Sequence, residues 1–210
     1  MKKRNTFLIV SLFLCALIIA GATYAYLTAT SNEKTNIFTK GNNISIELRE
    51  PAWDGEGFDT DMLPEETSDM GKAKADSILP GRVIPKDPTV KNTSDDSVWI
   101  AIKLEYTGEI SSYDDFKSFA SFEDKSDKWI AADLTNTVFY YKTQVGHDEI
   151  TDSLFKNVTI SKNANYDQLK NYKIVVTAYA VQAEGIDSIE DAKVQLNDLI
   201  KSSSAAVSVQ

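Results

Sequence analysis

Several segments of the chain alternate between apolar and polar positions. From 98 to 106 every second residue is large and apolar, and the positions between them include Lys103 and Glu105. The same alternation runs through 44–48, and 172–183 is a longer run of β-branched and aromatic residues. A period of two places successive side chains on opposite faces of a strand. The pattern therefore predicts strands in these three segments.

Shorter apolar runs separated by turn residues indicate further strands. Residues 138–145 and 154–160 are two such runs. Pro85 and Pro88 flank a short extended segment that ends at Val90, and because proline has no N–H to donate, we expect this segment at a sheet edge. Several strands with turns between them and few helices are typical of an antiparallel β-sandwich. The predicted fold class is therefore mainly β.

Two segments follow the spacing of a helix instead. Apolar residues at 113, 116, 119 and 120 predict a short helix near 113–122. The sequence Ser188-Ile-Glu-Asp resembles a capping box, and the apolar residues after it share one face. We therefore expect a C-terminal helix near 188–201 that packs on the body of the protein, followed by a frayed tail at 203–210.

The segment 54–76 interrupts the apolar pattern. It holds eight acidic residues and two lysines, so we expect a solvated acidic loop within a sandwich domain that spans 41–202. Carboxylates between Asp54 and Asp61 are of the type that binds calcium, but their spacing does not match an EF-hand loop. A solvated loop is the preferred interpretation.

The first 25 residues have the layout of a secretory signal peptide. A basic start is followed by an apolar run from Phe7 to Ala20 and then by small residues. Cleavage after Ala25 would make Tyr26 the mature N-terminus. The alternative is an uncleaved membrane anchor, because the apolar stretch can be read through to Leu27. If the signal peptide is cleaved, we expect only the precursor to associate with the membrane.

Composition narrows the possible chemistry. The net charge is −9, which argues against a nucleic-acid-binding protein. The chain has one cysteine, Cys15, which lies inside the predicted signal peptide, and one histidine, His147. A zinc site with two or three histidines therefore cannot be built, and no Gly-x-Ser-x-Gly sequence presents a nucleophilic serine. We expect no catalytic residue, no metal site and no cofactor.

A group of aromatic residues has two interpretations. They could line a glycan-binding site, but aromatic side chains at strand spacing are more often part of a core. The core interpretation is preferred for the group, which consists of Trp53, Trp99, Trp129, Tyr140, Tyr141 and Tyr179.

Short blocks spread over residues 22–185 resemble the TasA/camelysin family of exported proteins of Gram-positive bacteria. The blocks are Ala22-Thr-Tyr-Ala-Tyr-Leu-Thr28, Asn36-Ile-Phe-Thr-Lys-Gly41, Ile44-Ser-Ile-Glu-Leu48, Ile78-Leu-Pro-Gly81, Pro88-Thr-Val-Lys-Asn-Thr93 and Ala178-Tyr-Ala-Val-Gln-Ala-Glu-Gly185. The resemblance implies a jelly-roll sandwich, processing by the signal peptidase SipW, and polymerisation into biofilm matrix fibres outside the cell or at its surface.

The resemblance also implies that the mature N-terminal segment completes the sheet of the next subunit. Residues 26–40 are a candidate for such a donor strand, with Leu27, Ile37 and Phe38 as the side chains offered to the neighbour. A disordered leader is the alternative interpretation of the same residues. The partners expected are therefore further copies of this chain or related matrix subunits. Two other functions stay open: an exported camelysin-like metallopeptidase, and a monomeric cell-surface adhesin or binding module.

Overall fold

The computed structural model describes residues 36–40, 43–58, 67–165 and 169–207. The predicted signal peptide, the cleavage site at Ala25 and Tyr26, and the candidate donor residue Leu27 lie outside these ranges. The described residues belong to one compact unit. No helix within them is long and apolar enough to cross a membrane.

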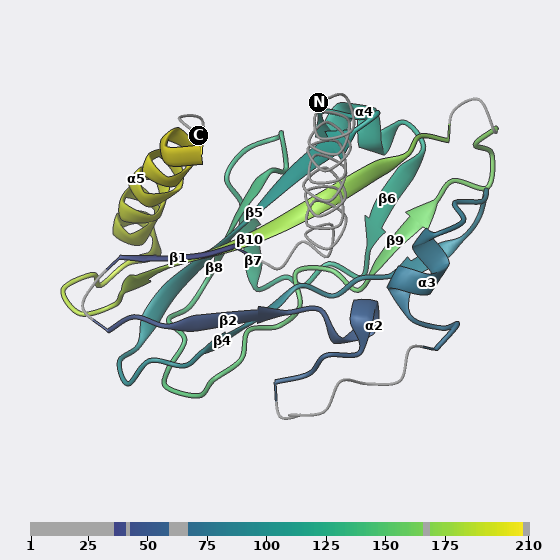
Figure 1. The fold of residues 1–210 in the computed structure, drawn as a ribbon. Helices are drawn as coiled ribbons and strands as arrows, with labels where there is room; N and C mark the ends of the chain where they lie inside the picture. The colour runs from purple at the N-terminus through teal and green to yellow at the C-terminus, as the bar shows by residue number, and fades with distance from the viewer. Residues whose placement is uncertain (1–35, 41–42, 59–66, 166–168, 208–210) are drawn as a thin grey trace, which may run out of the picture. The chain divides into compact units, whose positions relative to one another are not determined.

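A five-stranded sheet forms the centre of this unit (Figure 1). Its strands, in spatial order, are β1 (Asn36–Lys40), β10 (Tyr172–Gln182), β5 (Val98–Gly108), β8 (Val138–Tyr141) and β7 (Trp129–Ala131). Strands β10 and β5 are antiparallel along their whole length, from Tyr172 opposite Gly108 to Gln182 opposite Val98. The pairs β5–β8 and β7–β8 are also antiparallel, whereas β1 runs parallel to β10.

Two smaller antiparallel sheets complete the β structure. One pairs β2 (Ile46–Arg49) with β4 (Thr89–Asn92), and the other has the order β3 (Val83–Pro85), β9 (Asn157–Ile160), β6 (Ala120–Glu123). The segment expected as one edge strand from Pro85 to Val90 is divided: Pro85 ends the edge strand β3, and Thr89 and Val90 begin β4. The helices are α2 (Pro51–Asp54), α3 (Gly71–Ala75), α4 (Tyr113–Lys117) and α5 (Ile189–Val207). The mainly β, sandwich-like class expected from the sequence is confirmed.

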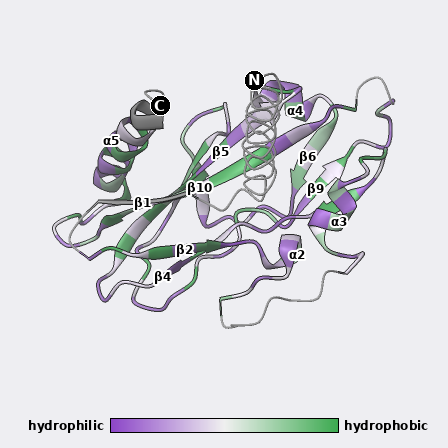
Figure 2. Ribbon diagram, viewed as in Figure 1, coloured by the Kyte–Doolittle hydropathy of each residue, from purple (hydrophilic) through white to green (hydrophobic). Residues whose placement is uncertain are grey.

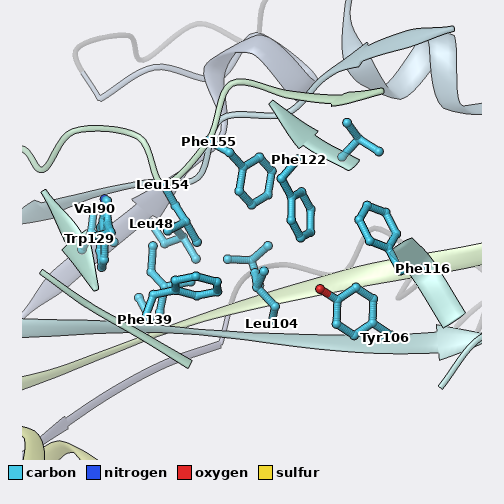
Figure 3. Close-up of a cluster of buried hydrophobic side chains, with 14 of the residues drawn as sticks. Leu48, Val90, Leu104, Tyr106, Phe116, Phe122, Trp129, Phe139, Leu154 and Phe155 are labelled. Carbon is cyan, nitrogen blue, oxygen red and sulfur yellow. The ribbon is translucent and has the colours of Figure 1, made fainter. Parts of the chain in front are cut away.

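The main core lies between the sheets. Figure 3 shows Leu104 and Tyr106 of β5 directed towards Phe116, Phe122 and other side chains from the facing elements. The ring centroids of Phe116 and Phe122 are 4.6 Å apart, and those of Phe122 and Phe155 are 4.2 Å apart. Hydrophobic residues along β2 and the central part of β10 stand out in Figure 2. Close packing of this kind fixes the relative position of the sheets.

The aromatic residues singled out in the sequence belong mainly to the cores, as expected. Trp99, Trp129, Tyr140, Tyr141 and Tyr179 are each at most 7% exposed. Trp53 is half-buried against the main core.

Several element boundaries differ from the prediction. The helix expected near 113–122 ends at Lys117, and 120–123 is strand β6, with Ala120 and Phe122 buried and Ser121 and Glu123 exposed. Helix α5 continues to Val207, into the segment expected as a frayed tail. The acidic segment 54–76 contains helix α3. Strands β8 and β9 are shorter than the apolar runs that predicted them.

Candidate assembly edge and polar clusters

Strand β1 forms one edge of the five-stranded sheet. Its backbone pairs with β10 in a parallel register that sets Ile37 beside Ala178 and Phe38 beside Tyr179. Two of the three candidate donor residues, Ile37 and Phe38, therefore lie in a strand. In this single chain that strand is paired with the chain's own β10. A strand held at an edge by main-chain hydrogen bonds has the geometry of strand addition.

Strand β10, the neighbour of β1, separates two apolar clusters. Ala178 is fully buried in the main core, whereas its neighbour Tyr179 belongs to a second cluster under α5. Because side chains alternate along a strand, the position next to β10 is flanked by an apolar cluster on each face. A strand that occupies this position can gain both backbone pairing and apolar burial.

Helix α5 packs against β10, β5 and β1. Ala192, Leu196 and Ile200 are its buried residues towards the second cluster. The helix begins after Ser188, whose hydroxyl accepts a hydrogen bond from Asp191 N at 3.2 Å, so the expected cap is present. Further along, Tyr140 Oη donates to Asn197 Oδ1 at 2.5 Å. These contacts fix α5 beside the edge that β1 occupies.

His147, the only histidine of the sequence, lies in a loop held by Asn92. Its Nδ1 is 2.8 Å from the carbonyl oxygen of Ser94, and its Nε2 is 3.2 Å from Asp148 Oδ2. The Asn92 side chain is fully buried and donates to the carbonyls of Asp96 and Val145. Within the described ranges, no three His, Cys, Asp or Glu residues gather closely enough to hold a metal ion.

The acidic segment begins with carboxylates that are engaged locally. Glu56 and Glu47 both form ion pairs with Arg49. Asp54 Oδ1 accepts a hydrogen bond from Glu56 N at 2.9 Å, and burial raises the pKa of Asp54 above its ordinary value. The acidic residues at 59–66 lie outside the described residues.

A buried ion pair near α2 was not predicted from the sequence. Lys86 Nζ lies 2.7 Å from Glu50 Oε2, and the two side chains are 7% and 14% exposed. The same Nζ lies 4.6 Å from the ring centroid of Trp53. Asp87, the next residue, accepts a hydrogen bond from Ala52 N at 2.7 Å. Burial, opposed by that hydrogen bond and assisted by the charge of Glu50, raises the pKa of Asp87 to about 6.

The sequence carries only a faint signal of this cluster. Lys86 and Asp87 stand between two prolines, which suggests a rigid segment, but nothing local points to Glu50 as a partner 36 positions away. The pairing follows from the way α2 folds back over the segment between β3 and β4.

Comparison with known proteins adds no relative. No protein-family model matches the chain, no curated protein matches it, and no solved structure matches it.

Proposed function

We propose that this chain is a structural subunit of an extracellular fibre, of the kind that its resemblance to the TasA/camelysin family implies. In this proposal a SipW-type peptidase removes residues 1–25, and the new N-terminal segment adds to the sheet of a neighbouring copy. The observation that supports it is the place of β1: an edge strand, parallel to β10, formed by residues of the candidate donor segment.

The single-chain arrangement and the fibre use the same pairing. If β1 moves to another copy, Ile37 of one subunit lies beside Ala178 of the next, and the backbone hydrogen bonds are replaced one for one. Exchange of an identical element is a low-cost route to assembly, and a head-to-tail contact of this type does not close on itself. Filaments are the expected product.

A disulfide-mixing experiment tests this register directly. Because the predicted mature chain has no cysteine, one variant carries Ile37→Cys and a second carries Ala178→Cys. After mixing and mild oxidation, we expect a disulfide that joins one chain of each variant. Leu134→Cys replaces Ala178→Cys in the control, since Leu134 is 94% exposed and reports random collision. Cross-linking no stronger than in this control would contradict exchange of β1.

Deletion of 26–40 tests assembly. The truncated protein should keep its β-type circular dichroism, since β5 and β10 stay paired and bury one face in the main core and the other in the cluster under α5. It should form no fibres under the electron microscope. Fibres like those of the intact protein would refute the donor-strand mechanism.

Two further experiments test the alternative functions. Casein hydrolysis that a chelator stops would identify a peptidase. A protein that stays monomeric at every concentration would favour a surface binding module.

A further inference from the structure

The buried pair formed by Lys86 and Glu50 has the geometry of two groups that can condense. The amine and the carboxyl group are in hydrogen-bond contact at 2.7 Å, and the residue Lys86 is only 5% exposed. Glu50 Oε1, the second oxygen of the same carboxyl group, is buried and has no hydrogen-bond partner among the described residues. A buried carboxylate normally has hydrogen-bond partners at both oxygens. Among the described residues, the Glu50 carboxylate has such a partner only at Oε2, which is Lys86 Nζ.

The surroundings keep water away from the pair. The Trp53 ring lies over Nζ, and the start of α3 packs against the same ring. A Cβ built on Gly71 would lie 2.7 Å from Trp53 Cε3 and 1.8 Å from the carbonyl oxygen of Pro85, so the helix approaches as closely as a backbone can. Exclusion of water favours condensation over hydrolysis, and it strengthens every interaction between the groups inside.

We propose that Lys86 and Glu50 form an intramolecular amide bond without an enzyme. A proton passes from the Nζ ammonium to the carboxylate, which leaves an amine and a carboxylic acid. The amine electron pair attacks Glu50 Cδ and the C–N bond forms; the C–O bond to the protonated oxygen then breaks, and this hydroxyl takes one further proton from the nitrogen and leaves as water. Nothing is oxidised or reduced. The product is an uncharged secondary amide that replaces two buried charges.

Asp87 is a neighbour of the pair whose carboxylate is held by the backbone of α2, where its Oδ1 accepts a hydrogen bond from Ala52 N at 2.7 Å. It follows Lys86 directly, and its carboxyl group is close enough to Glu50 for the two charges to influence each other. Both protons of the departing water come from the Lys86 ammonium, so the step balances without a third group.

The bond would close a loop at its base. Residues 50 and 86 enclose α2, α3 and the acidic segment, and the predicted mature chain has no cysteine with which to close it otherwise. A cross-link of this length restricts the unfolded chain in the way that a disulfide does. The inference is independent of fibre assembly, because a monomer and a fibre subunit would form the bond alike.

Mass spectrometry of the full purified chain tests the proposal. With the N-terminus fixed by its terminal peptide, we expect an intact mass that is lower than the sequence mass by one water molecule, and a branched peptide that joins Lys86 to Glu50. Lys86→Arg and Glu50→Ala should each restore the full mass. Lys103→Arg is the matched control, since Lys103 lies 2.9 Å from Glu105 in a pair whose carboxylate is 47% exposed, and it should keep the loss.

Two results would overturn the proposal. One is an unmodified mass after prolonged incubation, with Lys86 and Glu50 recovered in separate linear peptides. The other is a loss of water that maps elsewhere, for example to a succinimide at the Asp54-Gly55 sequence, with no branched peptide. Both readouts come from the unmutated protein, so they decide the matter even if a variant fails to fold.

Discussion

The indole Nε1 of Trp99 donates a hydrogen bond to the carbonyl oxygen of Ile186 at 3.1 Å, although the two residues are 87 positions apart. Trp99 lies near the start of β5, and Ile186 lies in the turn between β10 and α5. The bond is buried and sits within the second apolar cluster. It therefore fixes the direction in which the chain leaves the sheet and enters the C-terminal helix.

Trp99→Phe should lower the free energy of unfolding by about 2 kcal/mol, because it removes buried apolar volume and deprives the Ile186 carbonyl of its closest donor. Urea denaturation followed by circular dichroism measures the change. Val194→Ala is the control on α5: Val194 is 61% exposed, and its substitution should shift the midpoint very little. An effect of Trp99→Phe as small as that of Val194→Ala would contradict the stabilising role given to the Trp99–Ile186 contact.

Gly71→Ala should destabilise the protein strongly. The added Cβ would lie 1.8 Å from the backbone oxygen of Pro85, which cannot move without displacing β3. A loss of about 2–3 kcal/mol is expected for this overpacking. Gly57→Ala, where nothing lies within 4 Å of the new atom, serves as the control and should be nearly neutral. Thermal melts of both variants give the comparison, and a Gly71→Ala melt like that of the parent would contradict the contact between α3 and β3.

Asn92→Ala should cost about 2–3 kcal/mol of stability, since it removes two donations from the buried amide, to the carbonyls of Asp96 and Val145, and leaves the buried Ser94 N without its acceptor. The same substitution frees the turn that holds His147. Thr93→Ala, in an exposed residue of the same turn, should have a much smaller effect. Chemical denaturation distinguishes the two, and a nuclear magnetic resonance signal of His147 that shifts only in the Asn92 variant would confirm the link.

Asp87 should make stability depend on pH. Its folded pKa is raised from 3.8 to about 6, so the folded protein binds a proton more tightly than the unfolded chain does. The resulting stability is complete below about pH 4 and is lost as the pH rises through about 6. After a reduction for partial solvent screening, this loss amounts to about 1 kcal/mol.

Asp87→Asn should remove this part of the pH dependence while keeping an acceptor for Ala52 N. Unfolding free energies at about pH 4 and pH 7 measure the slope. Asp115→Asn provides a control of opposite sign, because hydrogen bonds from Ser111 and Ser112 lower the pKa of Asp115, and its contribution is lost on acidification. An unchanged slope in the Asp87 variant would contradict the role given to this carboxyl group.

The local sequence pattern is sufficient to predict those strands in which apolar and polar residues alternate without interruption. Strands β5 and β10 alternate over many residues, and the pattern predicts both within two positions at either end. It assigns β6 to a helix because Phe116, Phe119 and Ala120 share helical spacing, whereas the chain leaves the helix at Ser118 and pairs Ala120 with Ile160 of β9. Strand β7 has three residues and shows no period at all.

The remaining features depend on residues that are distant in the sequence. The pairing of β1 with β10, and of Lys86 with Glu50, arises when the sheets close, and no local window of sequence contains both partners. The candidate edge segment can therefore be located from the sequence, but the strand with which it pairs and the direction of that pairing cannot.

The register of β1 also has a consequence for the order of events after synthesis. Asn36 pairs with Thr177, so the first described strand docks on the last one. Contacts between such distant segments form late, because the chain loses the entropy of closing a long loop before these contacts stabilise it. A chain that emerges from its N-terminus exposes β1 throughout the time that its own β10 is still unmade or unpaired. If β1 exchanges between copies as proposed, the timing of emergence, and not only the relative stability of the two pairings, decides whether β1 pairs with its own β10 or with that of another copy.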